Sequence, residues 1–284
     1  MQGSSAECGP GRLPALFLGD LADPWVAGIA GALPEGSRAE ACPGLLPATW
    51  PQSCPPADVL VLHRDALSIG DRDRLAALKR TQDPPPRVIL CHGPHARPHH
   101  LETWLGLVDT FLPEATASEI VGGHVRPRES RERPDANVSI VGSQFEWRCA
   151  LAEALAGAGY SVEQHRDWPS NPGELVIWDV PALDRRWPDL LERRTLGRRV
   201  AVLLEFADRG LVRAARSAGA AACLDSLCEL DDLIGVIDRL AVAPPLPHGW
   251  RIRADGPSNP PGKPSQPAVA GRRRRATRPV DRAD

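Results

Sequence analysis

Three features of this sequence could carry chemistry, and the first is a single aspartate behind an apolar run. Asp179 directly follows the run 174–178. A carboxylate in that place ends a buried strand, at the edge where open α/β sheets bind their ligands. Asp179 is therefore a candidate functional residue, and the alternative is a loop aspartate that caps the neighbouring backbone.

The second feature is a segment rich in histidine and cysteine. Its side chains are good metal ligands, yet their spacing matches no tetrahedral metal site, and Gly93 and Pro94 interrupt the run. The 7 cysteines of the chain also lack a CxxC pair, which argues against a zinc ribbon or a disulfide framework. We therefore predict a solvated loop and no metal. The ligand-type residues of this segment are Cys91, His92, His95, His99 and His100.

The third feature is a basic segment. Residues 244–284 include nine basic and three acidic side chains, a charge of +6, so residues 1–243 carry −8 of the total of −2. Arginines can contact the phosphates of nucleic acid, but this cluster lacks interleaved aromatic residues, which favours a solvated tail with nonspecific affinity. The cluster consists of Arg272, Arg273, Arg274 and Arg275.

The elements that would position these residues occur in two similar series. Short apolar runs at 15–18 and 138–141 each precede a glycine and a helical stretch. In both stretches a tryptophan and two aliphatic residues are spaced by four, which places them on one helix face, as packing on a sheet requires. The continuous apolar runs 58–62 and 174–178 follow, as expected of central parallel strands buried on both faces.

Later segments keep the alternation of strand and helix. Regular alternation of this kind predicts open parallel sheets with helices on both sides. The predicted helices cover 71–80, 188–195, 211–217 and 231–240, and the predicted strands cover 87–90, 199–204 and 219–224.

One connection in the second half is too short for a helix. Only eight residues separate His165, which ends the second strand, from Glu174, which starts the third. Fully extended, these residues span about 26 Å at roughly 3.3 Å each. That length allows the chain to return along the sheet but leaves no room for a helix of ordinary length. We therefore predict that Trp168 and Pro169 cover the sheet there.

Composition marks the boundaries between segments. Glycine, serine and proline dominate residues 1–12, charges and prolines dominate 125–136, and proline and glycine recur through 244–284. These segments have too little apolar surface to offset the entropy lost on ordering a chain. The predicted organisation is a disordered N-terminus, a first domain at 13–124, a charged linker, a second domain at 137–243 and a disordered basic tail.

The second half resembles a receiver domain of the two-component response regulators. The run 174–179 is similar to the strand that ends in the phosphorylated aspartate, and 218–224 with 230–234 is similar to the last strand and helix. The resemblance covers about 105 residues, and the first half shows the same outline over 14–124. It implies two tandem flavodoxin-like, receiver-like domains, each an open parallel five-stranded sheet flanked by helices.

Phosphotransfer in that family needs an acidic pair that holds Mg²⁺, an acceptor aspartate, a hydroxyl and a lysine. Each group balances the charge of the transferred phosphoryl. The second half has Gly142, Ser143 and Gln144 in place of the acidic pair and Ser226 near the lysine position. Asp179 is then the only charged ligand left for a hard cation.

The first half departs from the family pattern in another way. It keeps Asp20, with Asp23 close behind, but has His63 at the aspartate position, Cys91 near the hydroxyl position and Glu114 near the lysine position. Neither half keeps the complete set. We therefore interpret both halves as degenerate receivers without catalytic activity or cofactor.

Tryptophan is abundant, with 8 residues beside a single tyrosine. Trp25, Trp147 and Trp178 fit core positions. The remaining five lie in or near predicted loops, where tryptophan can anchor a protein interface, and Trp168 and Trp187 are our candidates for such contacts. The five are Trp50, Trp104, Trp168, Trp187 and Trp250.

A retained core with incomplete sites favours a noncatalytic signalling or scaffold protein that uses paired pseudo-receiver domains to bind another protein. The alternative is an atypical response regulator phosphorylated at Asp179, associating with nucleic acid through its basic tail. No apolar run reaches the roughly 18 to 20 residues of a bilayer span, and residues 1–13 do not resemble a secretory signal. We therefore expect a cytoplasmic protein without membrane contact, and the sequence specifies neither the partner nor the oligomeric state.

Overall fold

The computed structural model describes seven stretches of the chain, all within one compact unit, Met1–Ile252. The described residues are 12–50, 52–66, 68–96, 101–126, 136–181, 184–195 and 197–243. Several predictions therefore lie outside them. These concern residues 1–11, most of the linker, His99, His100, Trp250, and the basic tail with Arg272, Arg273, Arg274 and Arg275.

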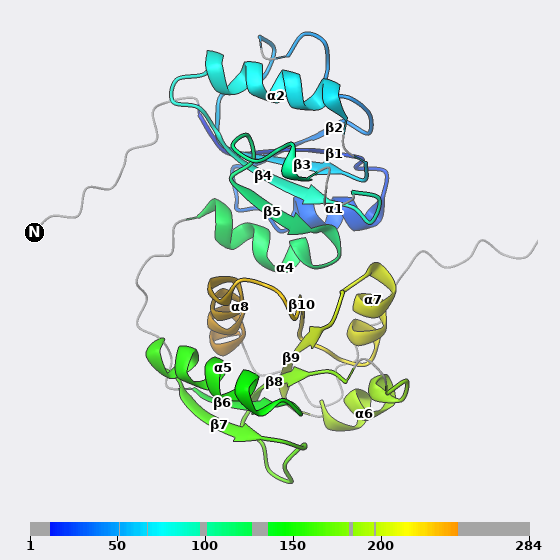
Figure 1. Ribbon diagram of the computed structural model, residues 1–284, viewed down its shortest axis with the longest axis vertical. Helices are drawn as coiled ribbons and strands as arrows, with labels where there is room; N and C mark the ends of the chain where they lie inside the picture. The colour runs from blue at the N-terminus through cyan, green and yellow to red at the C-terminus, as the bar shows by residue number, and fades with distance from the viewer. Residues whose placement is uncertain are drawn as a thin grey trace, which may run out of the picture. The chain divides into compact units, whose positions relative to one another are not determined.

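The first sheet has five parallel strands in the order β2-β1-β3-β4-β5 (Figure 1). Successive residues of β1 pack on opposite faces, as a pleated strand buried on both sides requires. Phe17 packs with helices α1 and α4, whereas Leu16 packs with helix α2. The strands are β1 Leu13–Gly19, β2 Arg38–Ala41, β3 Ala57–Arg64, β4 Arg87–His92 and β5 Thr110–Pro113, and the helices are α1 Pro24–Gly31, α2 Ile69–Thr81 and α4 Glu114–Val125.

The second sheet has five parallel strands in the order β7-β6-β8-β9-β10. Helices α5 and α8 pack on one face and α6 and α7 on the other, as Figure 1 shows. The strands are β6 Asn137–Val141, β7 Ser161–His165, β8 Leu175–Asp179, β9 Arg199–Leu204 and β10 Ala222–Asp225. The helices are α5 Phe145–Gly157, α6 Trp187–Arg194, α7 Arg209–Ser217 and α8 Leu230–Val242.

Both sheets therefore follow the same strand order, counted from the first strand of each as 2-1-3-4-5. This is the flavodoxin-like, doubly wound arrangement, in which helices cover both faces and the carboxyl ends of the strands meet at one edge. The predicted fold class of two tandem open parallel sheets is confirmed.

Local sequence signals start several of the helices. Asp23 caps α1 by accepting a hydrogen bond from Trp25 N, Ser68 caps α2, and Asp208 caps α7. Short polar side chains in these positions satisfy backbone N–H groups that the helix leaves unpaired. Pro24 follows the first cap and pre-sets the backbone angle of the first turn. The caps hold the loops that begin at the carboxyl edge of each sheet.

The connection from β7 to β8 contains no helix, as its length predicted. Trp168 lies on the sheet there and meets the ring of Trp178 edge to face, with ring centroids 5.6 Å apart. The Arg194 guanidinium lies over the Trp168 ring, 5.3 Å from its centroid. An aromatic cluster thus replaces the missing helix as cover for the sheet.

Three of the tryptophans expected in or near loops are buried: Trp50 and Trp104 lie in turns, and Trp187 begins α6. Trp187 is 5% exposed and packs with Leu191 and Val202 against the second sheet, while Trp50 and Trp104 are buried against the first. A side chain this deeply buried leaves little surface for a partner, and the suggestion that Trp187 anchors a partner stays a prediction. The suggestion for Trp168, which is half-buried, stays a prediction.

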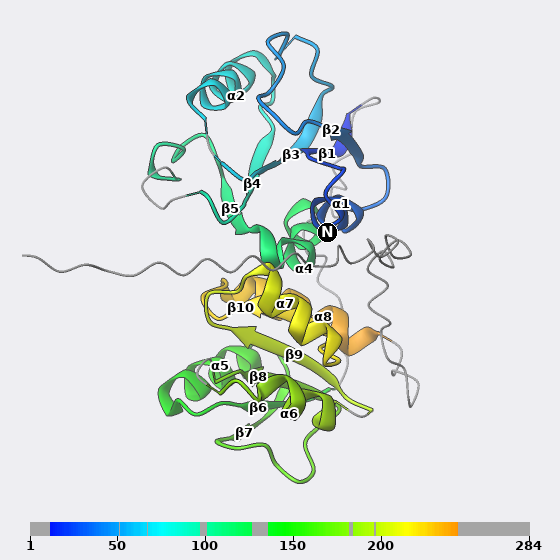
Figure 2. The same cartoon turned by 90° about the vertical axis from the view of Figure 1, so that its right-hand side faces the viewer.

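Helix α4 contacts elements from both halves of the chain. It packs on α1 and also on α7, β10 and α8 (Figure 2). Glu119 forms ion pairs with Arg216 of α7 and Arg239 of α8. Nε2 of His124 lies 2.8 Å from a carboxylate oxygen of Asp232. Helix α4 therefore contacts elements of both sheets within a single compact unit.

Candidate functional site

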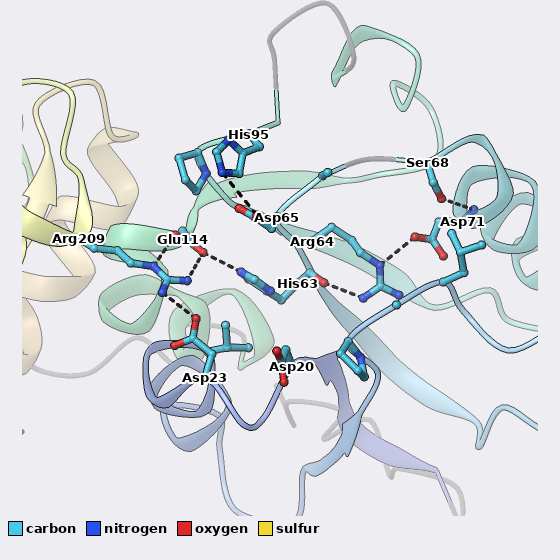
Figure 3. Close-up of a pocket in the computed structure, with 16 residues that line it drawn as sticks. Asp20, Asp23, His63, Arg64, Asp65, Ser68, Asp71, His95, Glu114 and Arg209 are labelled. Atoms are coloured by element: carbon cyan, nitrogen blue, oxygen red, sulfur yellow. Dashed lines mark hydrogen bonds and ion pairs between the residues drawn. The ribbon is translucent and has the colours of Figure 1, made fainter. Parts of the chain in front are cut away.

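The carboxyl edge of the first sheet opens into a cavity of about 730 Å³. Loops after β1 and β3 and the first turn of α4 line it, so side chains distant in sequence converge there, as Figure 3 shows. Its ionisable side chains are Asp20, Asp23, His63, Arg64, Asp65, Asp71, His95, Glu114 and Arg209.

A buried histidine and a buried glutamate form the centre of this site. His63 lies near the end of β3 and Glu114 begins α4, and the two residues are 5% and 4% exposed. The Nε2 atom of His63 lies 2.8 Å from Oε2 of Glu114. Gly19 makes room for this arrangement, because a Cβ atom there would lie only 3.0 Å from Cβ of His63.

Arg209, the first residue of α7, completes the network from the second half of the chain. Its Nε and Nη2 atoms donate to the two carboxylate oxygens of Glu114 at 2.6 and 2.8 Å, and its Nη1 atom donates to Asp23 at 2.7 Å. The guanidinium also lies 5.7 Å from the ring centroid of Trp25. Bidentate pairing and contact with an aromatic face are the interactions to which arginine is best suited.

The network shifts the acidity of its carboxyls. Burial by itself would raise the pKa of Glu114, but hydrogen bonds from His63 and Arg209 outweigh it and lower that pKa to about 2. The pKa of Asp23 is also lowered, because bonds from Arg209 and the backbone of Trp25 outweigh its partial burial. Both carboxyls are therefore ionised at neutral pH, and the guanidinium between them is already engaged.

A second buried ion pair lies beside the network. Arg64 donates from Nε to Oδ2 of Asp71 at 2.8 Å and from Nη1 to the carbonyl oxygen of Cys42. Asp71 also accepts a hydrogen bond from Leu46 N. This pair fixes the loop that follows β2, which is a structural role.

The corresponding edge of the second sheet has a different character. Asp179 ends β8 there, beneath Gly142, where an added Cβ would lie 3.0 Å from Cβ of Asp179. Among the described residues, none donates a hydrogen bond to the Asp179 carboxylate. Partial burial and then the charge of Glu205 raise its pKa. Ser143 and Gln144 follow β6 and Ser226 follows β10, so the neutral residues lie at the edge where the sequence placed them.

The histidine-rich segment does not form a cluster in the part of the chain described. Cys91 is buried in β4, where burial raises the pKa of its thiol to about 12. His92 ends the same strand, whereas His95 is exposed and lies 3.8 Å from Asp65. Within the described ranges, no three His, Cys, Asp or Glu side chains are grouped to hold a metal ion.

The sequence anticipated part of this site. The loop after β1 and the ends of β3 and β5 bring Asp20, Asp23, His63 and Glu114 to one edge, as the repeat predicted. Sequence reasoning missed Arg209, which lies 95 positions beyond Glu114. The signal that could have drawn attention to it was an arginine directly after the helix cap Asp208, a place where a cation is unfavourable unless a carboxylate compensates it.

Comparisons with known proteins give no match in sequence and a likeness in fold. No protein family matches the chain. No curated protein matches it either. A response regulator from Thermotoga maritima is 18% identical, with 39% of this chain and 100% of that one covered at a TM-score of 0.35. The chemotaxis response regulator CheY4 of Vibrio cholerae is 17% identical, with 38% and 99% covered at 0.34.

A third match is full-length FixJ from B. japonicum, which is 22% identical, with 37% of this chain and 57% of that one covered at a TM-score of 0.32. At TM-scores below 0.5 and identities below 25%, these matches carry no conclusion about the role of this chain. None of the helices described is long and apolar enough to span a bilayer.

Proposed function

We propose that this chain is a noncatalytic signalling or scaffold protein that uses its paired receiver-like domains to bind another protein. One observation carries the proposal: the first site holds its charges in the order opposite to that needed for phosphotransfer. His63 stands where the acceptor aspartate is expected, and Glu114 stands where the lysine is expected.

This reversal is unfavourable for an incoming phosphoryl group. The group carries negative charge and needs cations around it. It would instead meet the carboxylates of Glu114 and Asp23, both of which have a lowered pKa. Arg209 already binds both carboxylates, Arg64 is paired with Asp71, and Nε2 of His63 faces Glu114.

The second site offers an acceptor without its supporting charges. Asp179 lies at the carboxyl end of β8, but Glu205 adds negative charge nearby and raises its pKa. In a receiver, Mg²⁺ is held by carboxylates that follow the first strand of the sheet. At that place, after β6, this chain has Gly142, Ser143 and Gln144, which supply no carboxylate. Formation of an acyl phosphate here would lack both the metal and the lysine that balance it.

A second candidate function is phosphorylation of Asp179 in an atypical response regulator. The position of this residue at the sheet edge and the absence of a described hydrogen-bond donor to its carboxylate favour it. Association with nucleic acid through the basic tail belongs to the same candidate and concerns residues outside those described.

Phosphorylation with a small donor separates the two candidates. The full chain is incubated with acetyl phosphate and Mg²⁺, and its intact mass is measured before and after hydroxylamine treatment. We expect no mass gain. A gain that hydroxylamine removes, and that Asp179→Asn abolishes while the matched control Asp184→Asn retains it, would establish the regulator and overturn the noncatalytic proposal.

A further inference from the structure

Two neighbouring loops at the carboxyl edge of the second sheet present large apolar side chains to solvent. Phe206 follows β9 and is 72% exposed, Leu227 follows β10 and is 79% exposed, and Leu230 is 44% exposed. β9 and β10 pair directly, with Asp225 in register with Leu204, so the loops begin side by side. We call Glu205, Phe206, Leu227, Glu229 and Leu230 the Phe206 patch. Neighbouring exposed apolar residues of this size are characteristic of interaction surfaces.

The structure holds these loops in a defined conformation. The two carboxylate oxygens of Asp225 accept hydrogen bonds from Ala207 N and Leu227 N, each at 2.9 Å. Phe206 adopts a φ of 53°, in the left-handed region that bulky residues rarely occupy. One carboxylate therefore fixes both loops and keeps the phenyl ring exposed, so the ordering of the patch precedes any binding.

The surroundings of the Phe206 patch are acidic. A cavity of about 340 Å³ adjoins Leu227, and its lining includes Asp225, Glu229 and Asp232 but no lysine or arginine among the described residues. Burial, followed by the charges of Asp232 and Asp225, raises the pKa of Cys228 in its wall to about 12. The apolar part of its lining includes Phe111, Leu112, Pro113 and Ile120.

We propose that the Phe206 patch and its adjoining cavity bind a basic segment of a partner protein that carries an apolar anchor residue. The cavity is apolar at one side, and its described lining holds three carboxylates, of which Asp232 pairs with His124, but no lysine or arginine. The exposed Glu229 in the lining and the exposed Glu205 in the patch suit a leucine or similar side chain flanked by lysine or arginine. Arg209, which begins α7 directly after the loop that follows β9, is engaged with Glu114 and Asp23. This inference rests on the proposed protein-binding function and names its surface and the chemistry of its partner.

Charge argues against two other occupants. A second copy of this chain that presented the same patch would bring acidic residues against acidic residues. Nucleic acid would bring phosphates against carboxylates. A basic, apolar segment is the complementary ligand.

Fluorescence anisotropy with a labelled peptide tests the proposal. The probe is a fluorescein-labelled peptide of alternating leucine and arginine, titrated with the full chain at low and moderate salt. The comparison peptides have glutamate in place of arginine, or serine in place of leucine. We expect saturable, salt-sensitive binding of the first peptide and loss of at least about tenfold in affinity for the other two.

The variant Phe206→Gly separates recognition from folding. Glycine adopts a φ of 53° without strain, so the loop keeps its conformation and loses only the ring. We expect the melting temperature to stay within a few degrees and the peptide affinity to fall at least about tenfold. Leu227→Ser should act in the same direction. The matched control Ile69→Ser, at a residue 71% exposed on helix α2 of the first sheet, should leave affinity unchanged.

Three outcomes would overturn the proposal. They are equal binding of the glutamate peptide, unchanged affinity of Phe206→Gly, and self-association of the chain that Phe206→Gly abolishes. Failure here is distinguishable from failure of the proposed function. If Asp179 is phosphorylated and the peptide still binds, only the noncatalytic proposal is refuted. If Asp179 is not phosphorylated and the peptide does not bind, only the assignment of this patch is refuted.

Discussion

Replacing Arg209 with methionine removes the guanidinium that joins Glu114 to Asp23 while keeping much of the apolar stem. Glu114 would then stay buried, 4% exposed, with His63 as its remaining partner. Removing one member of a buried ion pair is costly, because the other charge is left without compensation. Since the Arg209 side chain is 33% exposed, solvent screens part of the loss. We expect the free energy of unfolding at pH 7 to fall by about 2 kcal/mol.

The dependence of this effect on pH follows from the lowered pKa of Glu114. A carboxyl whose pKa falls from 4.5 to about 2 on folding contributes about 3 kcal/mol above the unfolded pKa, at about 1.4 kcal/mol per tenfold change. That contribution is fully present above about pH 5 and is lost as the pH falls towards 2. Arg209 supplies part of it, so the difference between wild type and Arg209→Met should shrink by more than half from about pH 5 to about pH 2.

Urea unfolding followed by tryptophan fluorescence and circular dichroism at several pH values measures both quantities. A double-mutant cycle with Glu114→Gln isolates the pairwise contribution. Arg186→Met is the matched control, since Arg186 is 81% exposed in its surface pair with Asp184, and it should have no measurable effect. A destabilisation by Arg209→Met that is the same at all pH values, or additive with Glu114→Gln, would refute the electrostatic reasoning.

Two further predictions concern the described core. Asp71→Asn leaves the Arg64 guanidinium, which is 5% exposed, without its carboxylate. The free energy of unfolding, measured in urea, should fall by about 3 to 5 kcal/mol. A loss below about 1 kcal/mol would contradict the assignment of this pair as buried and ionic. Gly219→Ala should lower the free energy of unfolding, measured by thermal unfolding, by at least about 1 kcal/mol. The φ angle of Gly219 is +97°, and the added Cβ would lie 2.8 Å from Oγ1 of Thr195. Gly28→Ala in α1, with open space around it, should instead leave stability unchanged or raise it, and equal losses at both glycines would refute the argument.

Periodicity and chain length were sufficient to predict most of the fold. The apolar run 199–204 became β9 without a shift, and the helix expected over 188–195 became α6, Trp187–Arg194. The missing helix between β7 and β8 followed from the reach of eight extended residues. These predictions succeed because they depend on neighbouring residues, whose alternation in a strand or spacing in a helix is independent of distant partners.

Some features of the site could be predicted from the sequence and others could not. Parallel topology alone brings the end of β3 and the start of α4 to one edge, so His63 and Glu114 could be placed near one another before any coordinates. The hydrogen bond between His63 and Glu114 could not be predicted, because it depends on how α4 packs against the sheet. The burial of Trp187 was missed for a similar reason: a tryptophan at a predicted helix boundary is compatible with either surface or core until the facing helices are known.

The amino-acid order by itself therefore determined the alternation of strands and helices that builds the two parallel sheets, since this alternation is a property of local pattern. Only the tertiary structure decided that Arg209 reaches across to Glu114 and Asp23, and that Phe206 and Leu227 stand exposed on loops fixed by Asp225. Contacts of this kind join residues distant in sequence, and their geometry depends on how whole helices and strands pack.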